Sequence, residues 1–179
     1  MLHCNDMHCG FIPLLIKNNH LKTKTLLTIH NILHQGKTSL STARKIGIDD
    51  AQISKLMQWE IESKKINTLL EGILHADLVN TVSPSYAKEI RTEEYGAGLD
   101  EILQRKNINI VGILNGLDYS IRNPETDPFI SFHYGSTEKT FIDNHRLYSI
   151  NRGKLLNKKF LQKKLHLKMN SNIPFIGYI

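Results

Sequence analysis

Short apolar runs alternate with longer stretches of helical spacing along most of this 179-residue chain. The apolar runs predict strands at 2–4, 24–30, 78–82, 108–114 and 174–179. The longer stretches predict helices at 12–17, 49–59, 66–75, 84–90, 99–105 and 146–167, the last of them basic. Because strands that alternate with helices usually form parallel sheets, the sequence predicts an α/β fold with a parallel sheet flanked by helices.

Two local signals refine this pattern. Ser83-Pro84 combines a residue type that caps helices with proline at the first helical position, which predicts a helix start. The stretch 123–134 holds two prolines and two acidic residues in the sequence NPETDP, which indicates a loop.

The formal charge of +6 would suit an anionic partner, but its distribution favours a simpler interpretation. Most of the excess lies late in the chain, at Arg152, Lys154, Lys158, Lys159, Lys163, Lys164 and Lys168. Such a run is usually the solvated face of a helix, and no aromatic residues interleave with it as they do in nucleic-acid-binding motifs. We therefore expect no nucleic-acid partner.

No apolar run approaches the roughly 20 residues that a membrane span requires. The N-terminus has no basic patch followed by an apolar stretch, so no signal peptide is visible. We expect a cytoplasmic protein without a membrane partner. Cys4 and Cys9 each follow a histidine, but zinc sites usually need a second ligand pair further along the chain, and no later cysteine exists. We expect neither a metal nor a disulfide.

Three polar junctions follow predicted strands, at 5–10, 30–36 and 115–118. Ligands of open parallel sheets bind at the carboxyl ends of the strands, so these junctions form a candidate site. Each candidate residue also has a structural interpretation: Asp6 as a helix cap, His8 as a packed histidine, Asn31 and Asn115 as turn residues. Asn31 and Gln35 can donate and accept hydrogen bonds, which suits sugar hydroxyls.

Taken in order, longer motifs add to these junctions. The chain contains HCNDMHCG, TIHNILHQG, ADLVNTVSPSYAKEI, EYGAGLDEILQR, VGILNGLD and NPETDP, followed by Asn157-Lys158 and Leu161-Gln162 in the basic stretch. This series, from residue 2 to the last residue, resembles the bacterial glycogen synthases and plant starch synthases.

The resemblance implies two Rossmann-like domains that face each other across a cleft, the GT-B glycosyltransferase fold. Such enzymes transfer glucose from ADP-glucose to the non-reducing end of an α-1,4-glucan, with retention of configuration and without a cofactor or metal. By resemblance, His8 is the catalytic-site histidine that contacts the donor glucose, and Asn115 lines the same pocket. Asp6, His30, Asn31 and Gln35 lie in matching loops and are assigned supporting, substrate-binding roles.

The chain also departs from the family pattern. Met7, His34 and Arg122 stand where the family usually has tryptophan, tyrosine and tryptophan. By resemblance, residues 1–145 are the C-terminal portion of the first lobe, and 146–179 are the interdomain helix and first strand of the second lobe. The segments expected to hold the donor diphosphate are absent from these residues.

We therefore expect no transfer by this chain alone, because the leaving group would have no electrostatic partner. A missing second lobe could be supplied elsewhere as a partner. The alternative is a non-enzymatic remnant of a broken or split gene with at most weak glucan binding.

Overall fold

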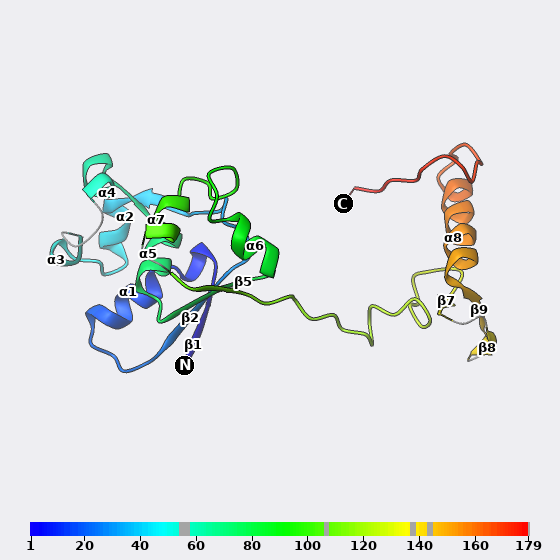
Figure 1. Cartoon of the computed structure of the whole chain (residues 1–179), viewed down its shortest axis with the longest axis horizontal. Helices are drawn as coiled ribbons and strands as arrows, with labels where there is room; N and C mark the ends of the chain where they lie inside the picture. The colour runs from blue at the N-terminus through cyan, green and yellow to red at the C-terminus, as the bar shows by residue number, and fades with distance from the viewer. Residues whose placement is uncertain (54–57, 106–107, 137–138, 143–144, 179) are drawn as a thin grey trace. The chain divides into compact units, whose positions relative to one another are not determined.

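A computed structural model describes residues 1–53, 58–105, 108–136, 139–142 and 145–178. The chain divides into two compact units, Met1–Asn115 and Gly116–Ile179. Figure 1 shows the helices and strands of both units.

The first unit is built on a parallel sheet of four strands. These are β1 (Leu2–Asn5), β2 (Thr25–Ile29), β5 (Leu78–Thr81) and β6 (Ile110–Gly112), in the order β1-β2-β5-β6. Cys4 pairs with Leu27, Leu27 with Val79, and Val79 with Ile110, so their side chains share one face of the sheet. The four strands predicted for this part of the sequence are confirmed. β2, β5 and β6 are shorter than predicted, whereas β1 extends one residue further, to Asn5.

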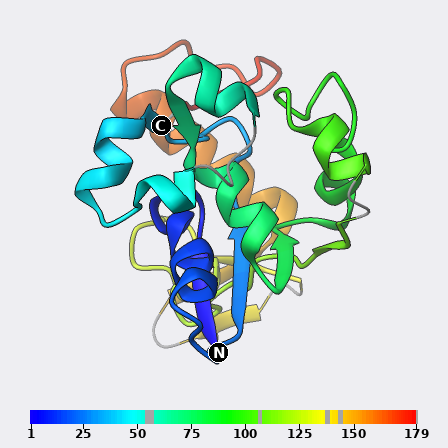
Figure 2. The same ribbon diagram turned by 90° about the vertical axis from the view of Figure 1, so that its left-hand side faces the viewer.

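Helices and a two-stranded antiparallel sheet complete this unit. The helices are η1 (Met7–Cys9), α1 (Phe11–Asn18), α2 (Leu40–Lys45), α3 (Asp50–Ile53), α4 (Gln58–Ser63), α5 (Thr68–His75), α6 (Pro84–Glu89) and α7 (Asp100–Arg105). Figure 2 shows α1 lying against the strands at the N-terminal end of the chain. Part of the helix predicted at 49–59 falls on residues 54–57, outside the described residues.

The two-stranded sheet was not predicted from the sequence. Strands β3 (Lys37–Ser39) and β4 (Lys65–Asn67) pair in antiparallel fashion, with Thr38 opposite Ile66. The helix predicted from residue 66 therefore begins only at Thr68, because Ile66 and Asn67 belong to β4. The expected helix start after Ser83 is confirmed, since its hydroxyl accepts a hydrogen bond from the Tyr86 N–H.

The main core lies between the sheet and its helices. Buried aliphatic side chains of the strands meet those of α5, α6 and α7, among them Leu27, Ile29, Leu69, Ile90 and Leu103. A second cluster joins Leu14 of α1 to Leu40, Ala43, Ile48 and Ile66 around the β3–β4 sheet.

A close approach between helices also positions the first of these loops. A Cβ added to Gly10, just before α1, would lie 2.0 Å from the Thr68 carbonyl oxygen at the start of α5. Gly72, one turn later in α5, faces Gly10 with an ideal Cβ only 3.0 Å from its Cα. Only glycine allows the η1–α1 turn to lie this close to α5.

The second unit contains β7 (Tyr134–Gly135), β8 (Lys139–Ile142), β9 (His145–Ser149) and α8 (Ile150–Lys164). The strands form a small sheet in the order β7-β9-β8. The prediction of a helix from Arg146 is wrong for its first four residues, because 146–149 form most of β9 and bury Leu147 in it. The helix also ends earlier than predicted, at Lys164, and His166 beyond it has a φ of 53°.

Polar and aromatic contacts hold α8 to this unit. The side-chain amide of Asn157 donates to the Phe132 carbonyl oxygen at 2.7 Å and accepts from the Phe132 N–H at 3.1 Å. The Phe132 ring lies edge-on to Tyr148 and Phe160, with centroid separations of 6.0 and 6.3 Å. These contacts explain why the basic helix is ordered against the loop that precedes the small sheet.

The strand predicted at 174–179 is absent from 174–178, and Ile179 lies outside the described residues. A strand needs a neighbour to satisfy its backbone hydrogen bonds. Lys158 instead holds the preceding segment by donating to the carbonyl oxygens of Ser171 and Ile173. In the described part of the chain, no helix is both long and apolar enough to cross a membrane.

Candidate functional site

The turn after β1 links two of the predicted junctions through Asp6. Its carboxylate oxygen Oδ1 accepts hydrogen bonds from the His30 N–H at 2.7 Å and the Asn31 N–H at 3.4 Å. The Asp6 N–H donates to the Thr28 carbonyl oxygen at 2.9 Å. Its side chain does not cap η1, so the capping interpretation of Asp6 is wrong. Asp6 instead fixes the first residues of the loop that follows β2.

The backbone of Asp6 is unusual, with a φ of 52°. Residues other than glycine rarely adopt this conformation, and those that do cluster at functional sites. The strained turn leads directly into η1, which carries His8. The turn is closed by hydrogen bonds from the Cys9 N–H to the Asp6 carbonyl oxygen and from the Gly10 N–H to the Met7 carbonyl oxygen.

His8 is exposed on η1, so the interpretation of His8 as a packed core histidine is wrong. Its ring has no hydrogen bond to another described residue. A short helix at the carboxyl end of β1 thus presents an imidazole to solvent. An imidazole in this position can donate to or accept from a ligand hydroxyl.

His30 and Asn31 extend the same surface from the end of β2. The His30 ring nitrogen Nε2 lies 3.0 Å from the Asn5 side-chain oxygen, which orients the exposed ring. The Asn31 side-chain oxygen accepts from the Leu33 N–H at 3.0 Å, as in a local turn. The turn interpretation of Asn31 is therefore correct for its oxygen. Its amide nitrogen has no hydrogen bond to another described residue and can donate to a ligand.

Gln35 differs from the other predicted residues, because its side chain is buried. The amide nitrogen donates to the Ala97 carbonyl oxygen at 2.8 Å, and the amide oxygen accepts from the Asn67 side chain at 2.7 Å. Each end of the amide therefore already has a partner within the protein. A direct contact between this amide and a sugar would have to use its second N–H or the remaining lone pair of its oxygen.

Asn115 lies at the other edge of the sheet. Its side chain is exposed, three residues after β6 ends. A hydrogen bond from the Ile113 N–H to the Thr81 carbonyl oxygen continues the pairing with β5 one residue beyond β6. Since β1 and β6 are the two edge strands of the order β1-β2-β5-β6, their ends lie roughly 14 Å apart at the usual strand spacing. The structure thus brings Asp6, His30 and Asn31 together and places Asn115 apart from them at the same end of the sheet.

An open cavity of about 520 Å³ lies beside these residues. Gly36, with a φ of 62°, forms part of its wall, and an ideal Cβ there would lie 3.0 Å from the Met7 side chain. Its lining includes Met7, Leu33, His34, Gln35, Lys37 and Ala97. Met7, His34 and Lys37 were not predicted as site residues. The available signal for this cavity was the predicted residue Gln35, because its neighbours His34 and Gly36 also line the cavity.

The cysteines flank the Asp6–His8 turn as free thiols. Cys4 is buried, and burial, together with the nearby Cys9 thiol, raises the pKa of Cys4 above its ordinary value. Among the residues that the structure describes, no three histidine, cysteine or acidic side chains are grouped closely enough to hold a metal ion. The predicted site residues carry imidazole, amide and carboxylate groups.

Comparison with known proteins assigns the chain to a family. The family model for the starch synthase catalytic domain matches residues 1–105. The glycogen synthase of Streptococcus gordonii is 36% identical over 187 aligned residues, and that of Thermosipho africanus is 40% identical over 185. Each alignment covers the whole chain but only 36% and 35% of the relative, so the chain spans about a third of their length.

A solved structure is similar as well. The catalytic domain of starch synthase IV from Arabidopsis thaliana, bound to ADP and acarbose, matches with a TM-score of 0.70 and 31% sequence identity. The match covers 93% of this chain and 33% of that one. It confirms the predicted Rossmann-like parallel sheet flanked by helices as part of a glycosyltransferase. Because the family model also spans more than half of its residues, the chain belongs to the starch synthase catalytic domain family.

Proposed function

We propose that this chain supplies the glucan-binding part of a glycogen synthase site, in which glucose passes from ADP-glucose to an α-1,4-glucan. The observation that carries the proposal lies at the carboxyl ends of β1 and β2. The imidazoles of His8 and His30 are exposed there, and the Asp6 carboxylate accepts hydrogen bonds from the N–H groups of His30 and the half-buried Asn31. Membership of the family supports it, and so does the similar starch synthase IV, which was solved with ADP and acarbose.

Each residue has a role in this proposal. His8 donates a hydrogen bond to the transferred glucose and supports the charge that develops as the bond to phosphate breaks. His30 and Asn31 bind sugar hydroxyls, and Asp6 holds both through their backbone N–H groups. Asn115 contributes from the β6 edge. Gln35 acts through its buried hydrogen bonds rather than by touching the sugar.

The residues assigned to the sugar include no partner for the diphosphate. The set Asp6, His8, His30, Asn31, Gln35 and Asn115 contains no lysine or arginine, whereas a departing diphosphate requires compensating positive charge. We propose that protein outside these 179 residues supplies that charge in the second lobe. Residues 1–145 then belong to the first lobe, and 146–179 to the connection between the lobes.

Glucan binding can be tested on this chain directly. Electrophoresis through gels that contain glycogen measures retardation by the polysaccharide, and His8→Ala and Asn31→Ala should reduce it. Lys22→Ala, which changes an exposed side chain just before β2 at the amino end of the sheet, is the matched control and should not. Equal retardation of all four proteins would contradict the proposed site and favour a remnant without glucan binding.

Transfer is tested separately with labelled ADP-glucose and glycogen. The 179-residue polypeptide should incorporate no label, because it lacks the cations that stabilise the leaving group. Turnover by this polypeptide at a rate typical of enzymes would contradict the proposal that the diphosphate is held by a second lobe.

A further inference from the structure

A line of buried hydrogen bonds connects the loop after β2 to the start of α5. Gln35 donates to the Ala97 carbonyl oxygen at 2.8 Å and accepts from the Asn67 side chain at 2.7 Å. The Asn67 N–H in turn donates to the Glu60 carboxylate at 2.7 Å. The exposed fractions of Gln35, Asn67 and Glu60 are 7%, 1% and 0%, so water does not compete for these bonds.

Asn67 determines how this line is oriented. Its side-chain oxygen caps α5 by accepting from the Leu70 N–H at 3.1 Å, which leaves its amide nitrogen to face Gln35. Because the Asn67 side-chain NH2 group donates, the oxygen of the Gln35 amide must point toward Asn67. The nitrogen of the same amide then points to Ala97, since a buried amide group without a partner is costly. The cap of α5 therefore sets the orientation of the Gln35 side chain.

Gln35 is one of three anchors of the segment 30–36, which contains neither helix nor strand. Asp6 holds its first residues, and the Tyr86 hydroxyl accepts from the Ile32 N–H at 3.0 Å near its middle. At its end, the Gln35 carbonyl oxygen accepts from the Leu69 N–H at 3.1 Å and the Thr68 hydroxyl at 3.2 Å. Gln35 and Ala97 also line the 520 Å³ cavity.

We propose that Asn67 is a positioning residue for the saccharide site. Acting through Gln35, it holds the segment 30–36 in the conformation that presents His30 and Asn31 and shapes the adjacent cavity. This inference rests on the proposed glucan binding, and it assigns a role to a residue that has no contact with the sugar.

Asn67→Asp separates the two functions of this side chain. The carboxylate keeps an oxygen to cap Leu70, and a negative charge at a helix start is favourable. It loses the donor to Gln35, so two oxygen atoms would oppose each other unless the Gln35 amide turns and gives up Ala97. Gln35→Glu makes the complementary change, because it keeps the acceptor for Asn67 and removes the donor to Ala97.

The experiment combines hydrogen exchange of the free chain with glycogen-gel retardation. Both variants should raise amide exchange in 30–36 by about tenfold, the factor that corresponds to one weakened buried hydrogen bond. Amides of β2 and β5 should keep their protection, and the apparent dissociation constant for glycogen should rise by about the same factor. Ser39→Asp changes the cap of α2 without touching Gln35 and should alter neither.

The outcomes are distinct. Unchanged exchange in 30–36 would overturn the inference, as would faster exchange with unaltered glycogen affinity. Faster exchange throughout the sheet in both variants would indicate a general loss of stability and would also overturn it. If the wild-type chain does not bind glycogen, the proposed function fails, and the exchange data alone decide whether Asn67 orders the loop.

Discussion

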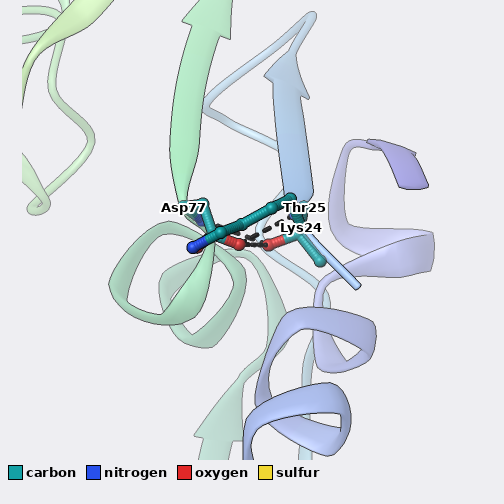
Figure 3. Close-up of polar contacts among 3 residues, drawn as sticks. All are labelled: Lys24, Thr25 and Asp77. Atoms are coloured by element: carbon teal, nitrogen blue, oxygen red, sulfur yellow. Dashed lines mark hydrogen bonds and ion pairs between the residues drawn. The ribbon is translucent and has the colours of Figure 1, made fainter. Parts of the chain in front are cut away.

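The Asp77 carboxylate joins the beginnings of β2 and β5 and makes the stability of the first unit depend on pH. One carboxylate oxygen accepts from the Lys24 ammonium at 2.9 Å, and the other accepts from the Thr25 N–H at 2.8 Å and the Thr25 hydroxyl at 3.0 Å (Figure 3). The Asp77 N–H returns a hydrogen bond to the Thr25 hydroxyl oxygen at 3.1 Å. We predict that Asp77→Asn destabilises the sheet at neutral pH.

The magnitude follows from the pKa. The hydrogen bond from Lys24, followed by those from Thr25, lowers the pKa of Asp77 from 3.8 to about 2. Without solvent screening, this pKa difference corresponds to about 2.4 kcal/mol of stability. Because the side chain remains 28% exposed and its Lys24 partner 76% exposed, solvent screening reduces the expected contribution to roughly 1 kcal/mol.

The sign of the pH dependence is fixed by the lowered pKa. The carboxylate contributes its full stabilisation above pH 3.8, the ordinary value in the unfolded chain, and loses it as the pH falls toward about 2. Urea unfolding monitored by circular dichroism from pH 7 to pH 2.5 measures the difference between the wild type and Asp77→Asn. That difference should be constant above about pH 5 and should shrink below pH 4.

Lys24→Gln is the matched control, because it removes the exposed cation and leaves both Thr25 bonds in place. It should cost less than Asp77→Asn at neutral pH. A difference between the wild type and Asp77→Asn that stays constant down to pH 2.5 would refute the reasoning. A larger loss of stability in Lys24→Gln than in Asp77→Asn would also refute it, since the hydrogen bonds between Asp77 and Thr25 would then contribute little.

Two further predictions concern the core. Gly10→Ala should destabilise the first unit by about 2 kcal/mol or more, because the new methyl group would lie 2.0 Å from the Thr68 carbonyl oxygen. Gly116→Ala is the control: no atom lies within 4 Å of its new methyl group, so the denaturation midpoint should change little. Leu27→Ala should cost about 2–5 kcal/mol in urea unfolding, since its side chain is fully buried in the central part of the sheet. The Leu33 side chain is 70% exposed, so the free energy of unfolding of Leu33→Ala should lie within about 0.5 kcal/mol of the wild type. Equal losses of stability in both leucine variants would contradict the assigned core.

The parallel sheet could be predicted because its strands lie in short apolar runs, and polar junctions follow three of them. Thr25–Ile29 and Leu78–Thr81 fall within such runs and pair in register. The antiparallel pairing of β3 and β4 could not be predicted, since Lys37–Ser39 and Lys65–Asn67 have no apolar alternation and depend on contacts between residues far apart in the sequence. In the second unit, residues 146–149 join a sheet because tertiary pairing outweighs the helical pattern of the residues that follow.

The sequence predicted the positions of some site residues but not the contacts of others. The positions of His8 and His30 followed from the rule that ligand groups lie at the carboxyl ends of strands. The role of Asp6 as a bridge to the next loop did not, because it depends on a backbone conformation with a φ of 52°. Nor could the sequence show that Gln35 is buried, since that depends on Asn67, thirty-two residues later.

The central claim is that the carboxyl ends of β1 and β2 bind the glucan. Titration of the isotopically labelled chain with maltoheptaose, followed by two-dimensional NMR of the backbone amides, locates the binding surface residue by residue. The account predicts shifts concentrated at Asp6–His8 and His30–Gly36, with the amides of Lys24, Thr25 and Asp77 at the opposite end of the sheet unaffected. Shifts confined to that opposite end, or no saturable shifts at any concentration, would contradict it.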